Sequence, residues 1–403
     1  MINNRTVSLL CIVCSLMLFV TIKAKAVVVS NVSELSNAIV QANRGGDRTI
    51  ELQDGTYTLD DMLGVEADGV TVRSISKNRN TVIIEGRGMD GAVTHIFNVS
   101  GSNFTVRDVT LRRVANHAVQ IHGELNADAP LISNVHILDT YEQMIKISYD
   151  LNNPTAGSDN GIIENCLLEY STGIGPQWYI GGIDVHNAKN WIVRGNTFRG
   201  IRSPGENLAE FAIHFWSNSR NTLVERNLIM NCDRGIGFGM GMRGHIGGII
   251  RNNMIFHDTF EDFADVGIGL ESAPNAQVYN NTIYHAHSYP NAIEYRFSGT
   301  SGVLIANNLT NRAIAQRDGA SGSVSHNVTD AESNWFINPS AGNLHLSSAI
   351  PTVVDQGRSI SGLTTDFDGG SRPQGDGIDI GADEWGSGIP GSLPIYSGND
   401  SEG

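Results

Sequence analysis

A short string recurs along the middle of the chain at nearly regular spacing. Successive copies begin 26 to 31 residues apart. The eight strings start at residues 106, 132, 163, 193, 224, 250, 278 and 305 and read VRDVTL, ISNVHI, IENCLL, VRGNTF, VERNLI, IRNNMI, VYNNTI and IANNLT. A period of this length built from short β-rich segments is typical of a solenoid, in which each repeat packs only against its neighbours. No other feature of the sequence restricts the fold as strongly.

A second set of aligned strings follows the first. They are AVQIHG (118–123), MIKISY (144–149), GIDVHN (182–187), AIHFWS (212–217), GIGFGM (235–240), GIGLES (267–272), AIEYRF (292–297) and AIAQRD (313–318). Apolar residues alternate with other residues in these strings, which predicts strands rather than helices. The chain also has 45 Gly and 38 Asn, residues that tolerate tight left-handed turns. We therefore expect two strands in each repeat, joined by short turns.

Asparagine occupies the fourth position of five successive strings. These residues are Asn196, Asn227, Asn253, Asn281 and Asn308. One amide at the same place in each repeat predicts a stacked hydrogen-bonding ladder at a turn.

The pattern resembles a right-handed, single-stranded parallel β-helix over about residues 65–330. Residues 32–44 predict a short amphipathic helix that caps the N-terminal end, and residues 50–59 resemble its usual first strand. Residues 366–385 resemble a C-terminal segment of many secreted bacterial β-helix proteins and are expected to form the other cap. The expected organisation is one all-β domain over 27–385, followed by a flexible Gly/Ser/Pro-rich tail over 386–403.

The first 26 residues have the features of an export signal. Arg5 supplies a positive start, residues 7–22 are apolar, and Ala24-Lys25-Ala26 fits a cleavage site. We expect a secreted or periplasmic protein that has no membrane segment after cleavage. Cleavage would leave two cysteines, Cys166 and Cys232, and therefore no disulfide framework. A formal net charge of −15 argues against a nucleic-acid partner, and a monomer is expected.

The candidate site lies on one face of the second strands. Positions two and four of these strings are apolar and belong to the core, so positions three and five point outward. The third positions are Gln120, Lys146, Asp184, His214, Gly237, Gly269, Glu294 and Ala315. The fifth positions are His122, Ser148, His186, Trp216, Gly239, Glu271, Arg296 and Arg317. Neighbouring strands are about 4.8 Å apart, so Lys146, Asp184 and His214 should form a column with His186 and Trp216 beside it.

Two interpretations of this face are open. The glycines can form the floor of a functional groove, or they can simply allow a loop to pack closely over the sheet. Lys146 and Asp184 can likewise be a surface ion pair. The polar linker 199–210 carries Arg199, Arg202, Glu206 and Glu210, and Trp178 and Tyr179 precede Asp184; both segments are candidates for groove walls.

The layout resembles that of exported β-helix polysaccharide lyases. Lys146, Arg296, Arg317 and several His gather on one face of an acidic protein, which favours an anionic polymer as ligand. Proteins of this general layout include lyases of the alginate lyase and chondroitinase B type, pectate lyases and uronate C5-epimerases. The resemblance implies β-elimination on an acidic, uronate-containing polysaccharide, with alginate as the leading substrate.

Such a reaction requires a base and a positive charge that neutralises the uronate carboxylate. We expect Lys146 or Arg296 to neutralise the carboxylate, His214 or Lys146 to act as the base, and Asp184 to position them. A divalent cation is an open possibility: Asp184, His186 and His214 suit a transition metal, and Glu206 and Glu210 offer oxygen ligands for Ca²⁺. The expected substrate-binding residues are Trp216, His122, Arg202, Glu271, Glu294 and Tyr179.

Three alternatives to a lyase follow from the same face. Glu271 and Glu294 lie on adjacent strands, about 8 Å apart by strand geometry, which suits an inverting glycoside hydrolase. A uronate C5-epimerase would use similar residues without shortening the polymer. A non-catalytic carbohydrate-binding protein would use Trp216 and the arginines for binding alone.

Overall fold

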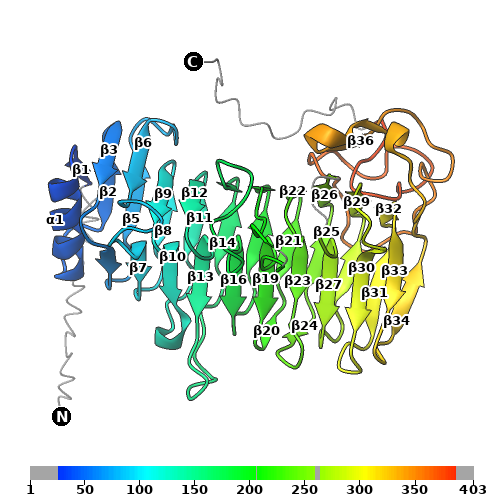
Figure 1. Cartoon of the computed structure of the whole chain (residues 1–403), viewed down its shortest axis with the longest axis horizontal. Coiled ribbons are helices and arrows are strands. Elements are labelled where there is room, and N and C mark those ends of the chain that lie inside the picture. Colours follow the sequence, from blue (N-terminus) through cyan, green and yellow to red (C-terminus); the bar gives the residue numbers. More distant parts are fainter. Residues whose placement is uncertain (1–25, 206, 259–263, 387–403) are drawn as a thin grey trace, which may run out of the picture.

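The computed structural model describes residues 26–205, 207–258 and 264–386. The predicted export signal and tail lie outside the described residues except for Ala26 and Gly386, and Glu206 also lies outside them. Figure 1 shows the strands stacked side by side along one long axis, from the helix at the N-terminal end to β34 at the other.

Three parallel sheets form the walls of the solenoid, and each turn of the chain contributes one strand to each sheet. Sheet A consists, in spatial order, of β1 (Val27–Val29), β2 (Thr49–Leu52), β5 (Thr71–Ser74), β8 (Thr105–Arg107), β11 (Leu131–Ser133), β14 (Ile162–Glu164), β17 (Ile192–Arg194), β21 (Leu223–Glu225), β25 (Ile249–Arg251), β28 (Gln277–Tyr279), β31 (Val303–Ala306) and β34 (Gly322–Ser325). Sheet B consists of β3 (Gly55–Thr58), β6 (Val82–Glu85), β9 (Thr110–Val114), β12 (His136–Thr140), β15 (Leu167–Glu169), β18 (Thr197–Arg199), β22 (Leu228–Met230), β26 (Met254–His257), β29 (Thr282–His285) and β32 (Leu309–Thr310). Sheet C consists of β4 (Leu63–Val65), β7 (His95–Val99), β10 (His117–His122), β13 (Ile145–Ser148), β16 (Ile183–His186), β19 (Ile213–Trp216), β23 (Ile236–Phe238), β27 (Ile268–Glu271), β30 (Asn291–Arg296) and β33 (Ala313–Gln316).

The parallel β-helix prediction is confirmed, but the expected two strands per repeat are wrong. Each six-residue string spans the end of a sheet A strand and the start of a sheet B strand. The residue at its third position joins the two strands and has a left-handed backbone in all eight strings, with φ between 52° and 63°. These residues are Asp108, Asn134, Asn165, Gly195, Arg226, Asn252, Asn280 and Asn307. A single left-handed residue turns the chain through the corner, so the sequence shows no loop between the two strands.

The predicted asparagine ladder is confirmed. Each side-chain amide donates to the Oδ1 atom of the next asparagine at 2.9–3.0 Å, from Asn196 through Asn308. Asn327 extends the ladder by one turn, and the backbone N–H of Cys166 donates to Asn196 at its other end. The ladder satisfies buried polar groups at the corner of every turn that it crosses.

An Asn253→Ala substitution is expected to destabilise the protein by about 2–4 kcal/mol. The side chain of Asn253 is fully buried, accepts from the backbone and side-chain N–H groups of Asn227, and donates to Asn281. Truncation leaves several buried donors and acceptors unpaired. Urea unfolding monitored by circular dichroism measures the change. The control Asn80→Ala alters an exposed turn residue; an equal loss of stability in both variants would contradict the role of the ladder.

The N-terminal cap is the predicted helix, α1 (Val32–Asn43). The side chain of Asn31 accepts from the backbone N–H of Glu34 at 3.0 Å, and the Glu34 carboxylate accepts from the N–H of Ser30 at 2.8 Å. This reciprocal pair starts the helix. Its apolar face covers the first turn of the core. The predicted single strand over 50–59 is instead two strands, β2 and β3, in different sheets.

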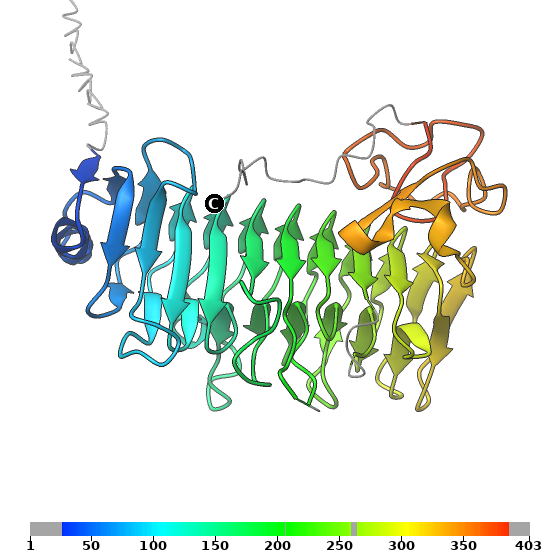
Figure 2. The same cartoon turned by 45° about the horizontal axis from the view of Figure 1, so that its top comes forward.

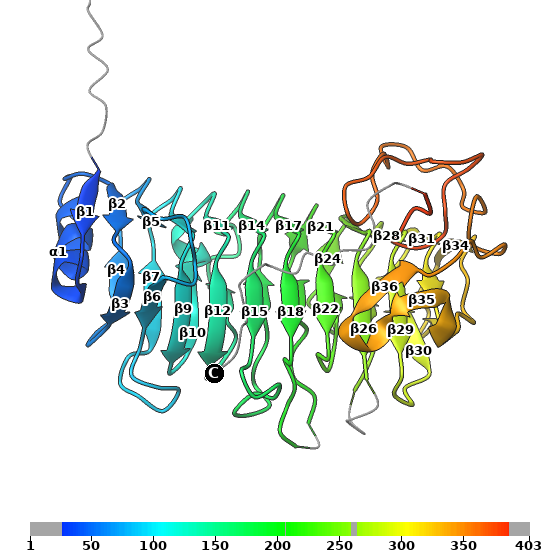
Figure 3. The same cartoon turned by 90° about the horizontal axis from the view of Figure 1, so that it is seen from above.

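The C-terminal segment, residues 331–385, lies on the flank of the last turns rather than over their open end. It contains η2 (Ser333–Trp335), β35 (Phe336–Asn338), η3 (Pro339–Ala341) and β36 (Asn343–Leu346). Figures 2 and 3 show it, in orange and red, covering sheet B around β26 and β29. Its apolar residues form a second core with outward-facing Leu228, Met254 and Leu309. Most of β34, the last strand of sheet A, stays exposed, so the segment predicted as an end cap covers a side of the solenoid.

The remaining elements are small. They are η1 (Gly123–Leu125) and the two-residue strands β20 (Ser219–Arg220) and β24 (His245–Ile246). Cys166 and Cys232 are both free and buried, as the prediction of a fold without disulfides requires for these two residues. None of the helices in the described part of the chain is long and apolar enough to cross a membrane.

Candidate functional site

The predicted column of outward-facing residues on sheet C has the expected register. Gln120 pairs with Lys146, Lys146 with Asp184, and Asp184 with His214 on successive strands. The column continues through Gly237, Gly269, Glu294 and Ala315. His186 and Trp216 are paired in the neighbouring column. The alternation of apolar and other residues in the second strands therefore gave the correct neighbours.

Lys146, Asp184 and His186 form the centre of a polar cluster. The Lys146 ammonium donates to the Asp184 carboxylate, and its Nζ atom lies 3.1 Å from Nε2 of His186. The indole N–H of Trp216 donates to the other Asp184 oxygen at 2.7 Å. Nδ1 of His214 lies 4.0 Å from the same oxygen. Asp184 in β16 thus contacts a cation from β13 and an aromatic side chain from β19, the two strands beside its own.

The charge states follow from burial and from Lys146. Burial alone would raise the pKa of Asp184, but Lys146 first, together with the imidazoles of His186 and His214, outweighs burial and lowers the pKa to about 2. Burial lowers the pKa of His186 to about 3, against the attraction of Asp184. At neutral pH Asp184 is therefore ionised and His186 neutral, so that Nε2 of His186 is free to accept from Lys146.

The middle of the face is covered, which corrects the prediction of an open glycine-floored groove. The ring of Phe211 lies over the strands that carry Gly237 and Gly269: a Cβ atom at Gly237 would be 2.6 Å from it and one at Gly269 3.1 Å. His214 lies under the same loop and is 0% exposed. Of the two interpretations of the glycines, close packing of a loop is the one that the structure shows.

The buried position of His214 follows from its contacts. Its ring stacks on Trp216 at 4.9 Å and packs against Phe211 at 5.1 Å. Its Nδ1 atom lies 3.3 Å from the Glu210 carboxylate, and its Nε2 atom 3.2 Å from the Gly239 carbonyl oxygen. These contacts leave no part of the His214 imidazole exposed on the surface.

Only part of the linker 199–210 is directed toward this face. Glu210 contacts His214 as described, whereas Arg202 is buried and pairs with Asp258 at 2.6 Å. Arg199 lies in β18 of sheet B and faces Glu169 at 3.5 Å. The guanidinium of Arg202 is thus enclosed and already paired, and its expected contact with substrate stays a prediction.

The charged residues at the far end of the column are engaged with one another. Glu294 is buried and accepts from Tyr289, Asn291 and Arg317 at 2.6–2.7 Å. Burial would raise the pKa of Glu294, but these hydrogen bonds outweigh it and lower the pKa. Glu271 accepts from the Gly241 N–H and lies 3.8 Å from Arg296, which also pairs with Asp318.

Arg296 is too far from Lys146 to act on the same sugar unit. The two residues are separated by five steps in the strand order of sheet C, about 24 Å at ordinary strand spacing. The structure therefore separates Arg296 from the Lys146 cluster, and a neutralising role for Arg296 stays a prediction for a different part of the face. Sequence reasoning missed a nearer cation, Arg243, whose Cζ atom lies 5.0 Å from the Trp216 ring centroid. Arg243 lies outside the aligned strings, in a turn whose position in space cannot be predicted from the repeat.

Four further side chains belong to sheet C or to the segments beside its strands. Tyr149 stacks on His186 at 4.9 Å; it is the last residue of the predicted string 144–149, directly after β13, and was not among the predicted site residues. His122 is held by Glu124 at 2.7 Å and Asn98 at 2.8 Å, two strands away from Asp184. Tyr179 and Trp178 are exposed, Trp178 at 52%, and lie in the loop before β16. Both aromatic rings are accessible to a ligand, as the substrate-binding prediction for Tyr179 requires.

The metal prediction at Asp184, His186 and His214 faces a specific obstacle. Lys146 already places a positive charge between the carboxylate of Asp184 and Nε2 of His186. Within the part of the chain that the structure describes, a group of possible metal ligands lies elsewhere: ligand atoms of His345, Asp368 and Asp383 are within 4.8 Å of one another.

Comparison with known proteins shows the fold alone. The chain matches no protein-family model and no curated protein. Among solved structures it is similar to pectate lyase Pel9A, with a TM-score of 0.54 and 13% identity over 90% of this chain and 97% of that chain. Weaker likenesses include an alginate lyase from Paenibacillus sp. str. FPU-7 (TM-score 0.43, 14% identity, 75% and 99% covered) and the Streptococcus pneumoniae surface adhesin PfbA (0.46, 14%, 74% and 89%). The molecule has the parallel β-helix fold of a pectate lyase, and its chemistry must be argued from its own residues.

Proposed function

We propose that this protein is a polysaccharide lyase that cuts an acidic, uronate-containing polymer by β-elimination, with alginate as the first candidate. The observation that carries the proposal is the placement of Lys146. Its side chain is 14% exposed, whereas the side chains of Asp184, His186 and His214 beneath it are almost fully buried. An amine that is held by a buried carboxylate and a buried imidazole, and is still partly exposed to solvent, has the arrangement of a positioned catalytic group. The pectate lyase fold of the chain is consistent with this activity.

Lys146 is the proposed base. Of the two candidates from the sequence, His214 is enclosed and Lys146 is accessible. After the ammonium has released a proton to solvent, the Lys146 amine takes the proton next to the uronate carboxylate, and the C–H electrons form the new C=C bond as the glycosidic C–O bond breaks. The leaving oxygen takes up a proton from the re-formed ammonium or from water. Asp184 and His186 are positioning residues, since each contacts Nζ and none of the reacting atoms.

Arg243 is the proposed neutralising group. Its guanidinium lies over Trp216, which is itself fixed by Asp184. A uronate carboxylate at Arg243 would place the sugar against the accessible part of Trp216, with its ring next to Lys146. Stacking of sugar faces on indole and pairing of carboxylate with guanidinium are both common. Tyr179 and Trp178 extend the binding surface along the polymer.

Glu294 does not suit the role of general acid in the hydrolase alternative. An inverting glycosidase needs one carboxyl group with a raised pKa, and Glu294 has a lowered one. Glu294 is also buried and bound to three side chains. The proposal further takes the mature chain to be a monomer that is secreted or periplasmic, in line with the export signal predicted for residues 1–26.

Ultraviolet absorbance of the unsaturated product tests the proposal. The protein is incubated with alginate, pectate, glucuronan and chondroitin, with and without chelator. We expect a rise in absorbance on at least one polymer, largest on alginate. New reducing ends without unsaturation would instead indicate a hydrolase, and an altered uronate composition without shortening would indicate an epimerase. Binding without any of these changes would leave a carbohydrate-binding protein.

A further inference from the structure

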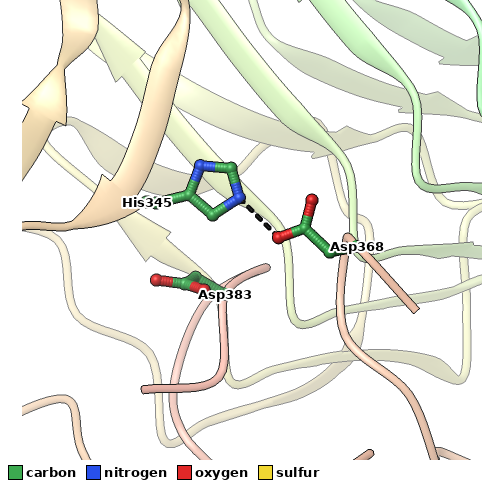
Figure 4. A group of neighbouring side chains, drawn as sticks. All are labelled: His345, Asp368 and Asp383. Atoms are coloured by element: carbon green, nitrogen blue, oxygen red, sulfur yellow. Dashed lines mark hydrogen bonds and ion pairs between the residues drawn. The ribbon is translucent and has the colours of Figure 1, made fainter. Parts of the chain in front are cut away.

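The C-terminal segment contains a second polar cluster, far from Lys146 in the sequence. His345 belongs to β36, and Asp368 and Asp383 belong to the part of the segment that follows it. His345 is buried, and the Asp368 and Asp383 carboxylates are 8% and 9% exposed. Figure 4 shows the imidazole directed toward Asp368, with Asp383 below it. Three groups able to bind a metal ion thus meet where two stretches of chain are held together.

The orientation of His345 is fixed by Asn343. Oδ1 of Asn343 accepts from the backbone N–H of His345 at 3.2 Å and faces Nδ1 of the imidazole at 2.7 Å. Nδ1 must therefore carry a hydrogen and donate it to this oxygen. The other nitrogen, Nε2, points at Oδ2 of Asp368 at 2.8 Å. An imidazole held through one N–H, with its other nitrogen directed at carboxylates, has the support that metal-binding histidines usually have.

Negative charge exceeds positive charge around this imidazole. Besides Asp368 and Asp383, the fully buried Asp366 also acts on His345 electrostatically. Two guanidinium groups lie nearby: Arg372 is bound to Glu384 at 2.8 Å and to the carbonyl oxygens of residues 379, 381, 382 and 383, and Arg226 lies beside Gly369. With Glu384 counted, four carboxylates outnumber these two guanidinium groups. Buried carboxylates in excess of their cations are costly unless a further positive charge joins them.

We propose that His345, Asp368 and Asp383 bind a divalent transition-metal ion, with Zn²⁺ or Mn²⁺ as the class of ion. One imidazole nitrogen and two carboxylate oxygens form a mixed ligand set that suits these ions, whereas Ca²⁺ and Mg²⁺ prefer oxygen alone. Bonds of roughly 2.0–2.2 Å to a tetrahedral ion place ligand atoms about 3.4 Å apart. The Nε2–Oδ2 pair at 2.8 Å would therefore open slightly, and the wider separations, at most 4.8 Å, would close.

The ion would link two parts of the C-terminal segment. His345 lies on β36, which packs in the second core against Leu228 and Met254, and the two aspartates lie in the stretch that crosses the same flank. Binding would therefore stabilise the cover of sheet B. The site is separate from Lys146, so this inference stands or fails independently of the proposed lyase activity.

Metal titration of the full-length protein tests the site. After chelation and dialysis, calorimetric titration with Zn²⁺, Mn²⁺ and Ca²⁺ is expected to show one equivalent of Zn²⁺ or Mn²⁺ bound at least tenfold more tightly than Ca²⁺. The melting temperature should rise with the same ion, and Co²⁺ should give a ligand-field spectrum. Absence of stoichiometric binding, or a preference for Ca²⁺, would overturn the proposal.

Two conservative variants locate the ion. Asp368→Asn and Asp383→Asn each keep an oxygen that can accept the existing hydrogen bonds and remove one charge. Each is expected to weaken Zn²⁺ binding at least tenfold, with an unchanged circular dichroism spectrum. The control is His122→Gln, which removes a histidine–glutamate pair on the solenoid itself. Equal affinity in wild type and both aspartate variants would show that any bound ion lies elsewhere. The Co²⁺ spectrum of wild-type protein decides the ligand type even if a variant misfolds.

Discussion

The Lys146→Arg variant is expected to fold normally and to lose lyase activity by at least about 100-fold in kcat/KM. Arginine keeps the positive charge beside the buried Asp184 carboxylate, so the cluster retains its ion pair. A guanidinium stays protonated in proteins and does not act as a base at ordinary pH. The variant therefore separates the two roles that the sequence left open for Lys146, neutralising cation and base.

Initial rates from product absorbance, together with the melting temperature, provide the measurement. Lys189→Arg is the matched control: Lys189 forms an ion pair with Asp159 at 3.1 Å, is more exposed than Lys146, and lies outside the cluster. It should retain wild-type activity. Substantial activity in Lys146→Arg would show that the residue neutralises charge and that another group takes the proton. Lys146→Met is less informative, because it leaves Asp184 buried without its cation.

Stability is expected to fall steeply as the pH drops from about 6.5 toward 4. Seven histidines have pKa values lowered chiefly by burial: His117, His186, His245 and His287 to about 3, His95 and His257 to about 4, and His285 well below its usual value. These imidazoles are neutral in the folded protein, and they bind protons below about pH 6.5 when the chain unfolds.

The direction of the change in stability with pH follows from these lowered pKa values. Between about pH 4 and 6.5 the unfolded chain binds more protons than the folded one, so the free energy of unfolding rises with pH and is lost on acidification. Each such histidine contributes a slope of up to about 1.4 kcal/mol per pH unit. Two or three such histidines together would lower the free energy of unfolding by much of its value in an ordinary domain when the pH falls by two units. His345 acts in the opposite direction: burial lowers its pKa, but Asp368 and neighbouring carboxylates outweigh burial and raise it.

Urea unfolding at pH 7, 6 and 5 measures the slope, and an acid titration by circular dichroism gives the midpoint, expected above pH 4. In a His245→Gln variant the slope should decrease by about one proton, since His245 is fully buried against Phe238. His122→Gln removes a part-exposed histidine and serves as the control. A stability that stays constant from pH 7 to 5 would contradict the assignment of neutral, buried imidazoles.

The repeat in the sequence was sufficient to predict the solenoid and the neighbours within sheet C. Lys146, Asp184 and His214 meet as expected because parallel strands in register place equivalent residues side by side. The same argument predicted the asparagine ladder. The third strand of each turn was missed because one left-handed residue, such as Asn252, replaces a loop.

Accessibility was not predictable in this way. Whether an outward-facing side chain reaches solvent depends on what covers it, and covering residues lie outside the periodic positions. Phe211 encloses His214 from the end of an irregular linker, and Arg243 reaches Trp216 from a turn between strands. Neither has a counterpart in the other repeats. One partial signal was present in a column of outward positions on sheet B. The column has Thr110, His136, Leu167 and Thr197 in earlier turns and Leu228, Met254, Thr282 and Leu309 in later turns, so apolar residues rise from one in four to three in four. This change marks the flank that the C-terminal segment covers.

That flank has a consequence for the order in which the molecule forms. Each early turn can pack on the turn before it as the chain is synthesised, because its strands pair with the equivalent strands of that preceding turn. The turns around β22, β26 and β32 differ, because their outward apolar residues are covered only by residues 331–382, which lie 22 to 154 positions later in the chain. Until residues 331–385 have been synthesised and have packed on this flank, the apolar side chains of these turns stay exposed and can bind to other unfolded chains. The last step of folding is therefore a long-range closure, and interrupted synthesis before it would favour aggregation over a shorter working solenoid.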